Sequence, residues 1–422
     1  MESKMTEGIK QQKTESPESA AEIQIELGIK KAQLKWLLQI THAINHNFSN
    51  QELLTIFEKV MREECRLSSY VLFYFNKKWN NVLSHPADEK TKTLSEKILN
   101  HLNSAGTFDS NSFKEWSEAF EILTPVMHER HQLAYLFTSG YGQNGRRSRN
   151  EMLKFVETIT NLIVVAMENN NFKRIREEQI AMKTELDMAA QLQKLLIPDK
   201  LPVNEHFEVE AFYLPHAEIG GDYYDFLETG ENEFVFCIAD VMGKGMPAAM
   251  LMANFQANLH ALLLQKLPLI SLISELNHRT YKLTRGERYV TFFIGRFDTK
   301  TRELHYFNAG HPPPVLVHMN VPLKLNNGST FLGTFPELPE MKAGRTILPS
   351  PGLILCYTDG ITDARNNNDE AFGTERVFDF LFSGVYKVPL KELHTRMIQK
   401  VDEFRGTEPH HDDITMLTLR FK

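Results

Sequence analysis

The chain has 422 residues, a length typical of two or three domains rather than one. Hydrophobic residues make up 42% and charged residues 24%, values that fit folded globular protein and exclude a chain that is disordered throughout. The net charge of −7 lacks the basic excess that nucleic-acid binding usually needs, so we expect no nucleic-acid partner. No run reaches the roughly 18 apolar residues that span a membrane, and the polar N-terminus does not read as a signal peptide. We therefore expect a cytoplasmic protein without a membrane span.

Three cysteines, Cys65, Cys237 and Cys356, are too few and too far apart to predict a disulfide framework or a zinc site. Cys237 and Cys356 stand inside apolar runs. We expect both to be small buried core residues with free thiols.

The N-terminal third begins with a polar, charged stretch, which predicts a disordered segment over residues 1–30. Apolar residues at helical spacing then predict two helices between residues 34 and 61. The run 69–75 indicates a strand, and residues 76–81 read as a hairpin turn. The further elements expected in this part are a return strand from Val82, strands near 119–127 and 132–138, and a helix over 148–167.

Two helices, a series of strands and a closing helix, in that order, resemble a GAF-type sensor domain over residues 31–170. The resemblance rests on the order of the elements and on no diagnostic motif. It implies an α+β domain that either binds a ligand or only dimerises. A PAS-like or other α+β sensor is the alternative.

A long connecting helix is expected from Met167 to Ile197, where Pro198 ends it. Apolar residues recur at alternating steps of three and four, the pattern of a coiled-coil seam. We expect residues 171–198 to be a linker helix through which two copies of the chain form a homodimer. An amphipathic helix packed on its own domain is the alternative. The eight seam positions are Phe172, Ile175, Gln179, Met182, Leu186, Ala189, Gln193 and Leu196.

Residues 199–422 are rich in strands. The run 234–239 is continuously apolar, as in a strand buried on both faces. Two helices, over 246–265 and 269–283, follow it. Together these elements predict an α/β sandwich of sheets flanked by helices. The other expected elements are strands at 207–211, 289–297, 303–307, 315–317, 353–357 and 414–421, and a helix at 390–404.

Aspartates stand at four strand ends of this C-terminal part: Asp222, Asp240, Asp359 and, as a pair, Asp412 and Asp413. An aspartate beside a glycine is usually a turn residue, and each of these alone could be one. Two carboxylates about 4 Å apart repel by about 4 kcal/mol at an effective dielectric constant near 20, so four of them gather only around cations or shared protons. Oxygen ligands without His or Cys spacing suit Mg²⁺ or Mn²⁺ rather than zinc.

A pair of such ions can generate a hydroxide nucleophile and hold a phosphoryl group, which suits the very slow hydrolysis of phosphate monoesters. Glycines beside the acids, such as Gly220, Gly221 and Gly360, would let the backbone approach bound ions closely. The sequence contains no phosphate-binding loop of the nucleotide-binding type.

Five motifs in this part, in their order, resemble the metal-dependent PPM phosphatases and specifically the bacterial SpoIIE/RsbU branch. The resemblance covers about residues 198–422 and implies an αββα sandwich with protein serine/threonine phosphatase activity. The motifs are GGDYYD at 220–225, ADVMGKG at 239–245, NAGHPPP at 308–314, YTDGITDA at 357–364 and HDDIT at 411–415.

By this resemblance, Asp222 and Asp240 hold the two catalytic metal ions, Mn²⁺ or Mg²⁺, with Asp240 bridging them. The backbone carbonyl of Val241 would bind beside Asp240. Asp359 and Asp412 would complete the second metal site.

Other motif residues carry open assignments. Asp363 resembles the acid that holds a weaker third metal ion in some members, and an exposed loop acid is the alternative. Asp413 is expected in a turn or beside the ligands, and Asp225 in a supporting position. His311 is either an acid for the leaving serine oxygen or, as is commoner before prolines, a structural hydrogen-bond partner. The phosphate-binding arginine of eukaryotic relatives has no evident match.

The resemblance implies that a metal-bound water removes phosphate from phosphoserine or phosphothreonine of a signalling protein, often a STAS-type anti-sigma-factor antagonist. It also implies that residues 186–198 couple the N-terminal sensor to the active site. A catalytically silent pseudophosphatase adaptor is the alternative, disfavoured because all four core aspartates are present. A nucleotide or diguanylate cyclase is a further alternative, for which the sequence has no signature.

Overall fold

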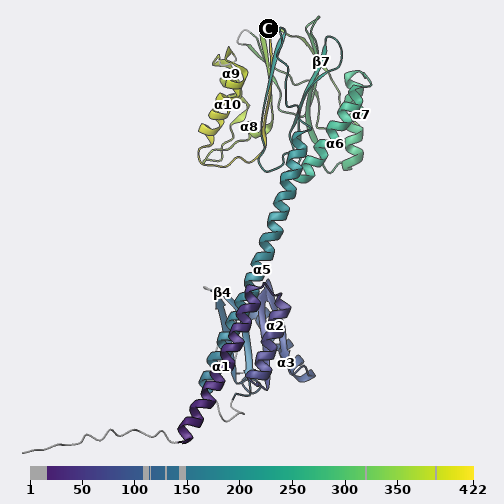
Figure 1. Ribbon diagram of the computed structural model, residues 1–422. Coiled ribbons are helices and arrows are strands. Elements are labelled where there is room, and N and C mark those ends of the chain that lie inside the picture. Colours follow the sequence, from purple (N-terminus) through teal and green to yellow (C-terminus); the bar gives the residue numbers. More distant parts are fainter. Residues whose placement is uncertain are drawn as a thin grey trace, which may run out of the picture. The chain divides into compact units, whose positions relative to one another are not determined.

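The computed structural model describes residues 17–107, 114, 116–128, 131–141, 149–318, 321–384 and 387–422. The chain divides into two compact units, Met1–Ile180 and Ala181–Lys422 (Figure 1). Among the described residues, no helix combines the length and the apolar character needed to cross a membrane.

The N-terminal unit is built on one antiparallel sheet with strand order β2-β1-β4-β3. Tyr70 and Leu72 of β1 face a core formed with α1, α2 and α5, whereas Val71 and Phe73 face a second core with α3. This alternation is the period of two that a strand between two helical layers requires. The elements are α1 (Pro17–Asn45), α2 (Asn50–Lys59), the π-helix η1 (Val60–Glu64), β1 (Ser69–Asn76), β2 (Lys78–His85), α3 (Glu89–Ala105), β3 (Ile122–His128), β4 (His131–Ser139) and α5 (Arg149–Lys194).

Three expectations for this unit need correction. Helix α1 begins at Pro17, so residues 17–30 are helical and not disordered, while residues 1–16 lie outside the described residues. The hairpin turn is shorter than expected, because Lys77 adopts a left-handed conformation and β2 starts at once. Helix α3 was not anticipated, although Asp88 caps its first turn by accepting from the Thr91 backbone N–H at 2.7 Å.

Helix α5 is a single element of 46 residues that starts in the N-terminal unit and continues into the C-terminal one. The closing helix and the linker helix expected from the sequence are therefore one continuous helix. It ends at Lys194 rather than Ile197, where Leu195 and Leu196 make tighter turn bonds to Leu192 and Gln193.

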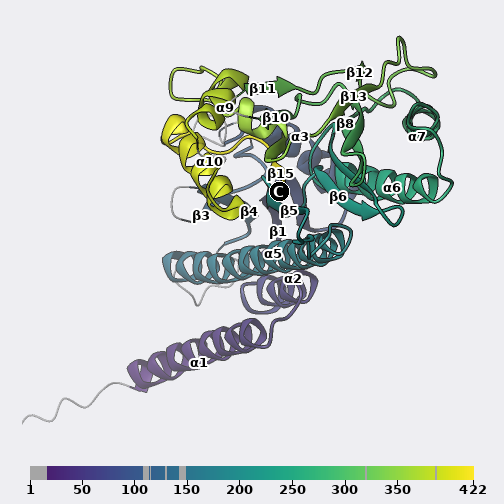
Figure 2. The same cartoon turned by 90° about the horizontal axis from the view of Figure 1, so that it is seen from above.

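The C-terminal unit contains two sheets that pack face to face, with a pair of helices on each outer side (Figure 2). One sheet has the order β11-β10-β14-β15-β5 and the other β12-β9-β8-β7-β6, with β13 paired to β9. The elements are β5 (Phe207–Leu214), β6 (Tyr223–Glu228), β7 (Glu233–Val241), α6 (Met246–Leu263), α7 (Leu269–Thr284), β8 (Val290–Asp298), β9 (Glu303–Ala309), β10 (Val315–His318), β11 (Val321–Lys324), β12 (Gly328–Ser329), β13 (Gly344–Ile347), β14 (Gly352–Tyr357), α8 (Asp359–Thr362), α9 (Gly373–Phe382), α10 (Leu390–Arg405) and β15 (Ile414–Phe421).

Strand β7 shows why the layers form. Phe236 and Ile238 point into the core between the sheets, whereas Cys237 and Ala239 point into the core under α6 and α7. A strand covered on both faces is apolar at every position, as its sequence is. On the other side, α9 and α10 pack on β14 and β15. The mixed α/β organisation expected for this half is confirmed, as are the buried, free thiols of Cys237 and Cys356.

Candidate metal centre

The aspartates singled out by the sequence come from both sheets of the C-terminal unit. Asp240 lies near the end of β7, and Asp222 immediately precedes β6, the strand paired with β7. Asp359 follows β14 and opens α8, and Asp412 stands two residues before β15 in the other sheet. The architecture therefore carries the four residues to the sheet ends, where both layers meet.

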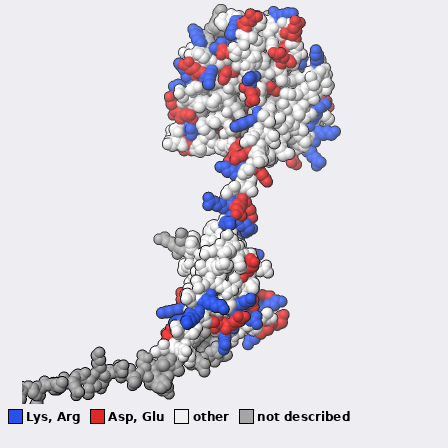
Figure 3. Space-filling model, in the orientation of Figure 1, with Lys and Arg blue, Asp and Glu red and all other residues white. Residues whose placement is uncertain are grey.

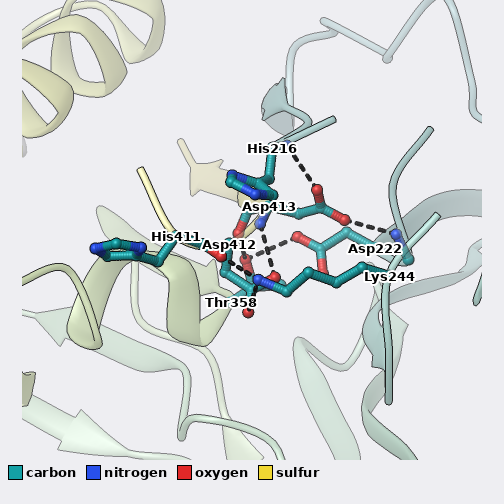
Figure 4. Close-up of polar contacts among 8 residues, drawn as sticks. His216, Asp222, Lys244, Thr358, His411, Asp412 and Asp413 are labelled. Carbon is teal, nitrogen blue, oxygen red and sulfur yellow. Dashed lines mark hydrogen bonds and ion pairs between the residues drawn. The ribbon is translucent and has the colours of Figure 1, made fainter. Parts of the chain in front are cut away.

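Asp222 is almost fully buried, with 1% of its surface exposed. Its Oδ2 accepts a hydrogen bond from the Thr358 hydroxyl at 2.9 Å (Figure 4). The same oxygen accepts a second bond from the Thr415 hydroxyl. Thr415 also uses its backbone N–H to bond the Thr358 hydroxyl at 3.0 Å. These two threonines were missed in the sequence, although each lies in a motif and close to an aspartate. They orient Asp222 from the opposite sheet.

Asp413 is buried and ties two distant segments together. Its Oδ1 accepts from the His216 backbone N–H at 2.7 Å, and its Oδ2 accepts from the Gly221 backbone N–H at 2.6 Å (Figure 4). Both carboxylate oxygens are thus occupied by the loop that leads to Asp222. This contact set supports the expected position beside the ligands rather than among them.

The glycines before Asp222 are required by close packing against protein atoms. A Cβ on Gly220 would lie 2.4 Å from Asp413 Oδ2, and one on Gly221 would lie 3.0 Å from the backbone carbonyl oxygen of Val241. We expected these glycines to let the backbone approach bound metal ions. In the structure they first allow the close approach of Asp413 and of the Val241 carbonyl.

The carboxylates influence one another strongly. Burial, and next the Asp240 charge, raise the pKa of Asp222 well above its usual range. Burial and the charges of Asp359 and Asp412 raise the pKa of Asp240 to about 7. Burial and the charges of Asp363 and Asp412 raise the pKa of Asp359 to about 6. Such mutual effects arise only when acids are near one another in a poorly solvated place.

Lys244 offers the cluster a positive charge. Its ammonium lies 3.2 Å from Asp412 Oδ2 and also donates to the His411 backbone carbonyl (Figure 4). Within the described part of the chain, no three His, Cys, Asp or Glu side chains are arranged as a ready metal-binding group. The donor chemistry nevertheless fits a hard divalent cation, because crowded carboxylates with raised pKa values and a facing carbonyl are the ligands that Mg²⁺ and Mn²⁺ favour. Asp363 is exposed beside Asp359.

Gln193, near the end of α5, was expected in the dimer seam. In the structure its side chain is instead hydrogen-bonded to the loop that precedes Asp222. Its side-chain Nε2 donates to the Gly220 carbonyl at 2.6 Å, and its Oε1 accepts from the Gly220 N–H at 3.3 Å. Gln193 is buried, and Leu196 packs against the core under α6 and α7. These two seam positions are therefore used within the C-terminal unit. A glutamine at a seam position was the available sequence signal.

His311 is buried and hydrogen-bonded to residues other than the aspartates. Its Nδ1 is 2.8 Å from the Thr291 hydroxyl, and its backbone N–H donates to the Asn308 side chain at 2.8 Å. Burial lowers the pKa of His311 to about 3, so the ring is neutral. No hydrogen bond or ion pair among the described residues joins it to the aspartates. This environment favours the structural assignment over the catalytic one.

Replacement of His311 by Ala should lower the free energy of unfolding by about 2–3 kcal/mol, because it leaves a cavity and an unpaired Thr291 hydroxyl. The kcat of the folded fraction should change by less than about threefold. Urea denaturation and kcat measurements on the same samples test this, with Thr291→Val as the companion variant. A large loss of kcat at unchanged stability would instead assign His311 to catalysis.

Comparison with known proteins shows which proteins this unit resembles. Residues 230–422 match the family model described as Stage II sporulation protein E (SpoIIE). The chain is 24% identical to phosphoserine phosphatase RsbU of Bacillus subtilis over 265 residues, 62% of this chain and 77% of that protein. It is 26% identical to protein IcfG of Synechocystis over 268 residues, 56% of this chain but only 41% of that protein.

A solved structure extends the comparison to the fold. The SiaA-PP2C domain of Pseudomonas aeruginosa aligns with 58% of this chain and 99% of its own length, at 21% identity and a TM-score of 0.52. The sandwich of two sheets and two helix pairs is thus a PP2C-like fold. Residues 230–422 are therefore similar to the SpoIIE family, and this part of the chain combines RsbU-like relatives with a PP2C-like fold.

Proposed function

We propose that the protein is a metal-dependent protein phosphatase that hydrolyses phosphoserine or phosphothreonine on a signalling protein. The convergence of Asp222, Asp240, Asp359 and Asp412 at the sheet ends of a SpoIIE/PPM-type domain carries the proposal. Crowded, buried carboxylates are costly without a counter-charge, and a phosphatase of this type uses that counter-charge in its reaction.

In this proposal, Asp222, Asp240, Asp359, Asp412 and the Val241 carbonyl hold two divalent ions, Mn²⁺ or Mg²⁺, with Asp240 shared between them. Asp363 is proposed to hold a third ion more weakly. Bound ions of this kind supply an activated water and offset the charge of the phosphoryl group.

The chain's own residues prepare this centre. The hydroxyls of Thr358 and Thr415 hold Asp222 Oδ2, so that its Oδ1 is left to face the cluster. Asp413 fixes the backbone at Gly221, which sets the position of Asp222. Lys244, on the loop after Asp240, holds Asp412 from the opposite side. Each contact reduces the freedom of a carboxylate before any ligand arrives.

Hydrolysis of p-nitrophenyl phosphate tests the proposal directly. Activity in the presence of Mn²⁺ that is lost with EDTA supports it, whereas activity that survives EDTA contradicts it. An inactive protein that still binds a phosphoprotein would favour the pseudophosphatase adaptor.

We propose a phosphorylated STAS-type anti-sigma-factor antagonist as the substrate. The likeness to RsbU, which extends over 62% of the chain, supports this class. Dephosphorylation of candidate antagonists from the same genome, with and without residues 1–170, identifies the substrate and the sign of regulation together.

The N-terminal unit is proposed to act as a GAF-like sensor. Its single sheet between two helical layers fits that class, and it contains a cavity of about 560 Å³. The cavity walls combine the aromatic rings of Phe75, Trp79 and Phe172 with Gln132 and Glu168, which suits a small molecule with both apolar and polar parts.

We further propose that α5 forms a parallel pair in a homodimer and passes the state of the sensor to the metal centre. Exposed apolar side chains along it, including Phe172, Ile175 and Met182, support pairing. The hydrogen bonds between Gln193 and Gly220 could connect the helix to the metal centre, because Gly220 lies two residues before Asp222. A change in helix packing that moves Gln193 would move this loop. Sedimentation equilibrium measures the dimer.

Replacement of Gln193 by Ala should raise the Mn²⁺ concentration for half-maximal activity by about tenfold, since the backbone at Gly220 loses two hydrogen bonds. Excess Mn²⁺ should restore most of kcat. Gln191→Ala is the matched control, because Gln191 lies exposed on the same helix. Equal Mn²⁺ dependence of the two variants would contradict a positioning role for Gln193.

A further inference from the structure

An apolar strip rich in methionine borders the metal centre. Met242 and Met246 are exposed on the segment that follows Asp240, and Met250 is 68% exposed one turn further along α6. Leu283, 54% exposed near the end of α7, faces the same region. Exposed methionines adapt their shape to a partner surface, and several together are common where a protein surface is bound.

A groove of about 360 Å³ continues this strip between the first half of α6 and the end of α7. It is open to a side chain or a short segment of a partner, and it combines apolar walls with a few polar groups. Its lining residues are Met250, Leu251, Asn254, Leu283, Thr284 and Arg288, with Glu287 at the side.

Arg288 connects the groove to the metal centre. Its guanidinium donates to the Met242 carbonyl at 3.2 Å, two residues beyond Asp240. Gly243, with φ of 108°, adopts a conformation open mainly to glycine, and a Cβ there would lie 2.6 Å from Arg288 Nη1. Two residues span at most about 7 Å, so this end of the groove lies close to the segment that carries Asp240.

The charges beside this face favour a phosphorylated partner. Lys244 lies between Met242 and Met246, and Arg288 lines the groove together with one acid, Glu287. Figure 3 shows blue basic side chains next to an uncharged area on the part of the C-terminal unit that α6 and α7 form. A small phosphate monoester would use only the aspartates. A phosphoprotein could also contact the exposed strip and the groove.

We propose that the Met242–Met246–Met250 strip and the groove beside Leu283 form the docking surface for the phosphoprotein substrate. This inference rests on the proposed phosphatase function and adds to it the surface that selects the substrate. Docking there sets the KM for a protein substrate, whereas the aspartates alone set the rate for a small phosphate ester.

Two leucine variants in the helix pair α6 and α7 provide the test. Leu283→Asp alters the groove, and Leu264→Asp is the matched control, since Leu264 is 85% exposed at the far end of α6. Leu264 lies 14 residues from Met250, about 21 Å along a helix. Each variant is assayed with Mn²⁺ on three probes: p-nitrophenyl phosphate, a phosphorylated STAS-fold protein from the same genome, and a short peptide with that protein's phosphoserine.

Leu283→Asp should lower kcat/KM on the phosphoprotein at least tenfold, mainly through KM, and change both small probes by less than twofold. Leu264→Asp should match the unaltered protein on all three. An unaltered protein that prefers the phosphoprotein no more than its peptide would overturn the docking surface. An equal loss of kcat/KM on all three probes in Leu283→Asp would also overturn the docking surface. A shift of Leu283→Asp to lower mass in sedimentation, at unchanged kcat/KM, would assign the groove to a second copy of the chain. Absence of any Mn²⁺-dependent activity in the unaltered protein would instead reject the phosphatase proposal itself.

Discussion

Asp240→Asn should lower kcat/KM on p-nitrophenyl phosphate by at least about 10³-fold at saturating Mn²⁺. Asp240 lies at the centre of the cluster, where Asp222, Asp359 and Asp412 all influence its charge or are influenced by it. An amide keeps the shape of the side chain but removes the charge that would be shared between two ions. The loss should appear in kcat as well as in metal affinity, because a shared ligand sets the geometry of both sites.

The same variant should keep its fold. Asn at position 240 removes a carboxylate whose ionisation is unfavourable in the metal-free protein, so the midpoint of thermal unfolding in EDTA should stay equal or rise. Asp363→Asn is the comparison variant. Because Asp363 is exposed, its replacement should lower kcat/KM by less than about tenfold. Full activity of Asp240→Asn in folded protein would remove Asp240 from the catalytic centre.

The strand and helix pattern of the C-terminal unit was readable from the sequence because its core elements are separated by turns. Strands β7 and β15 and helices α6 and α10 lie within about two residues of their expected ends. Strand β6 was missed because Asp225 interrupts its apolar pattern. Asp225 is buried and accepts a hydrogen bond from the Tyr223 hydroxyl. A polar residue in this strand is therefore accommodated by an internal hydrogen bond.

The candidate site was predictable in its residue types but not in its supporting contacts. Glycine-flanked aspartates at strand ends can be read from local sequence. The bonds from His216 and Gly221 to Asp413 join residues almost 200 positions apart and depend on how the two sheets meet. Gln193 was misassigned for a related reason. A heptad pattern gives the face of a helix, whereas the partner of that face is decided by tertiary packing.

The contribution of the aspartate cluster to the stability of the metal-free protein should fall as pH rises from about 4 to 7. The pKa of Asp240 is raised to about 7 and that of Asp359 to about 6, from an ordinary value of 3.8. The folded state therefore binds these protons more tightly than the unfolded state. Their contribution is complete below about pH 4 and is lost as pH rises through 6 to 7. For Asp240 it is on the order of 4 kcal/mol, which urea denaturation in EDTA measures.

Other buried groups change stability with pH in the opposite direction. The contribution of the cluster is therefore isolated by comparing the unaltered protein with Asp240→Asn. The pKa of His394 is lowered by burial to about 4, and its contribution to stability grows as pH rises towards 6.5. Asp240→Asn retains that histidine but lacks the titrating carboxylate. The unaltered protein should therefore lose stability relative to Asp240→Asn between pH 4 and 7. Parallel profiles in EDTA would show that Asp240 is not held protonated.

Mn²⁺ should reverse the trend, because the ion binds the ionised carboxylates and competes with their protons. The stabilisation that a fixed Mn²⁺ concentration provides should grow from pH 5 to pH 8, as the apparent Kd falls. Asp240→Asn should show little of this gain. The ionised cluster destabilises the fold without metal and stabilises it when metal is bound. Folding of the sheet ends is thereby coupled to metal binding. The same four carboxylates would thus account for both the pH profile of stability and the metal requirement of activity.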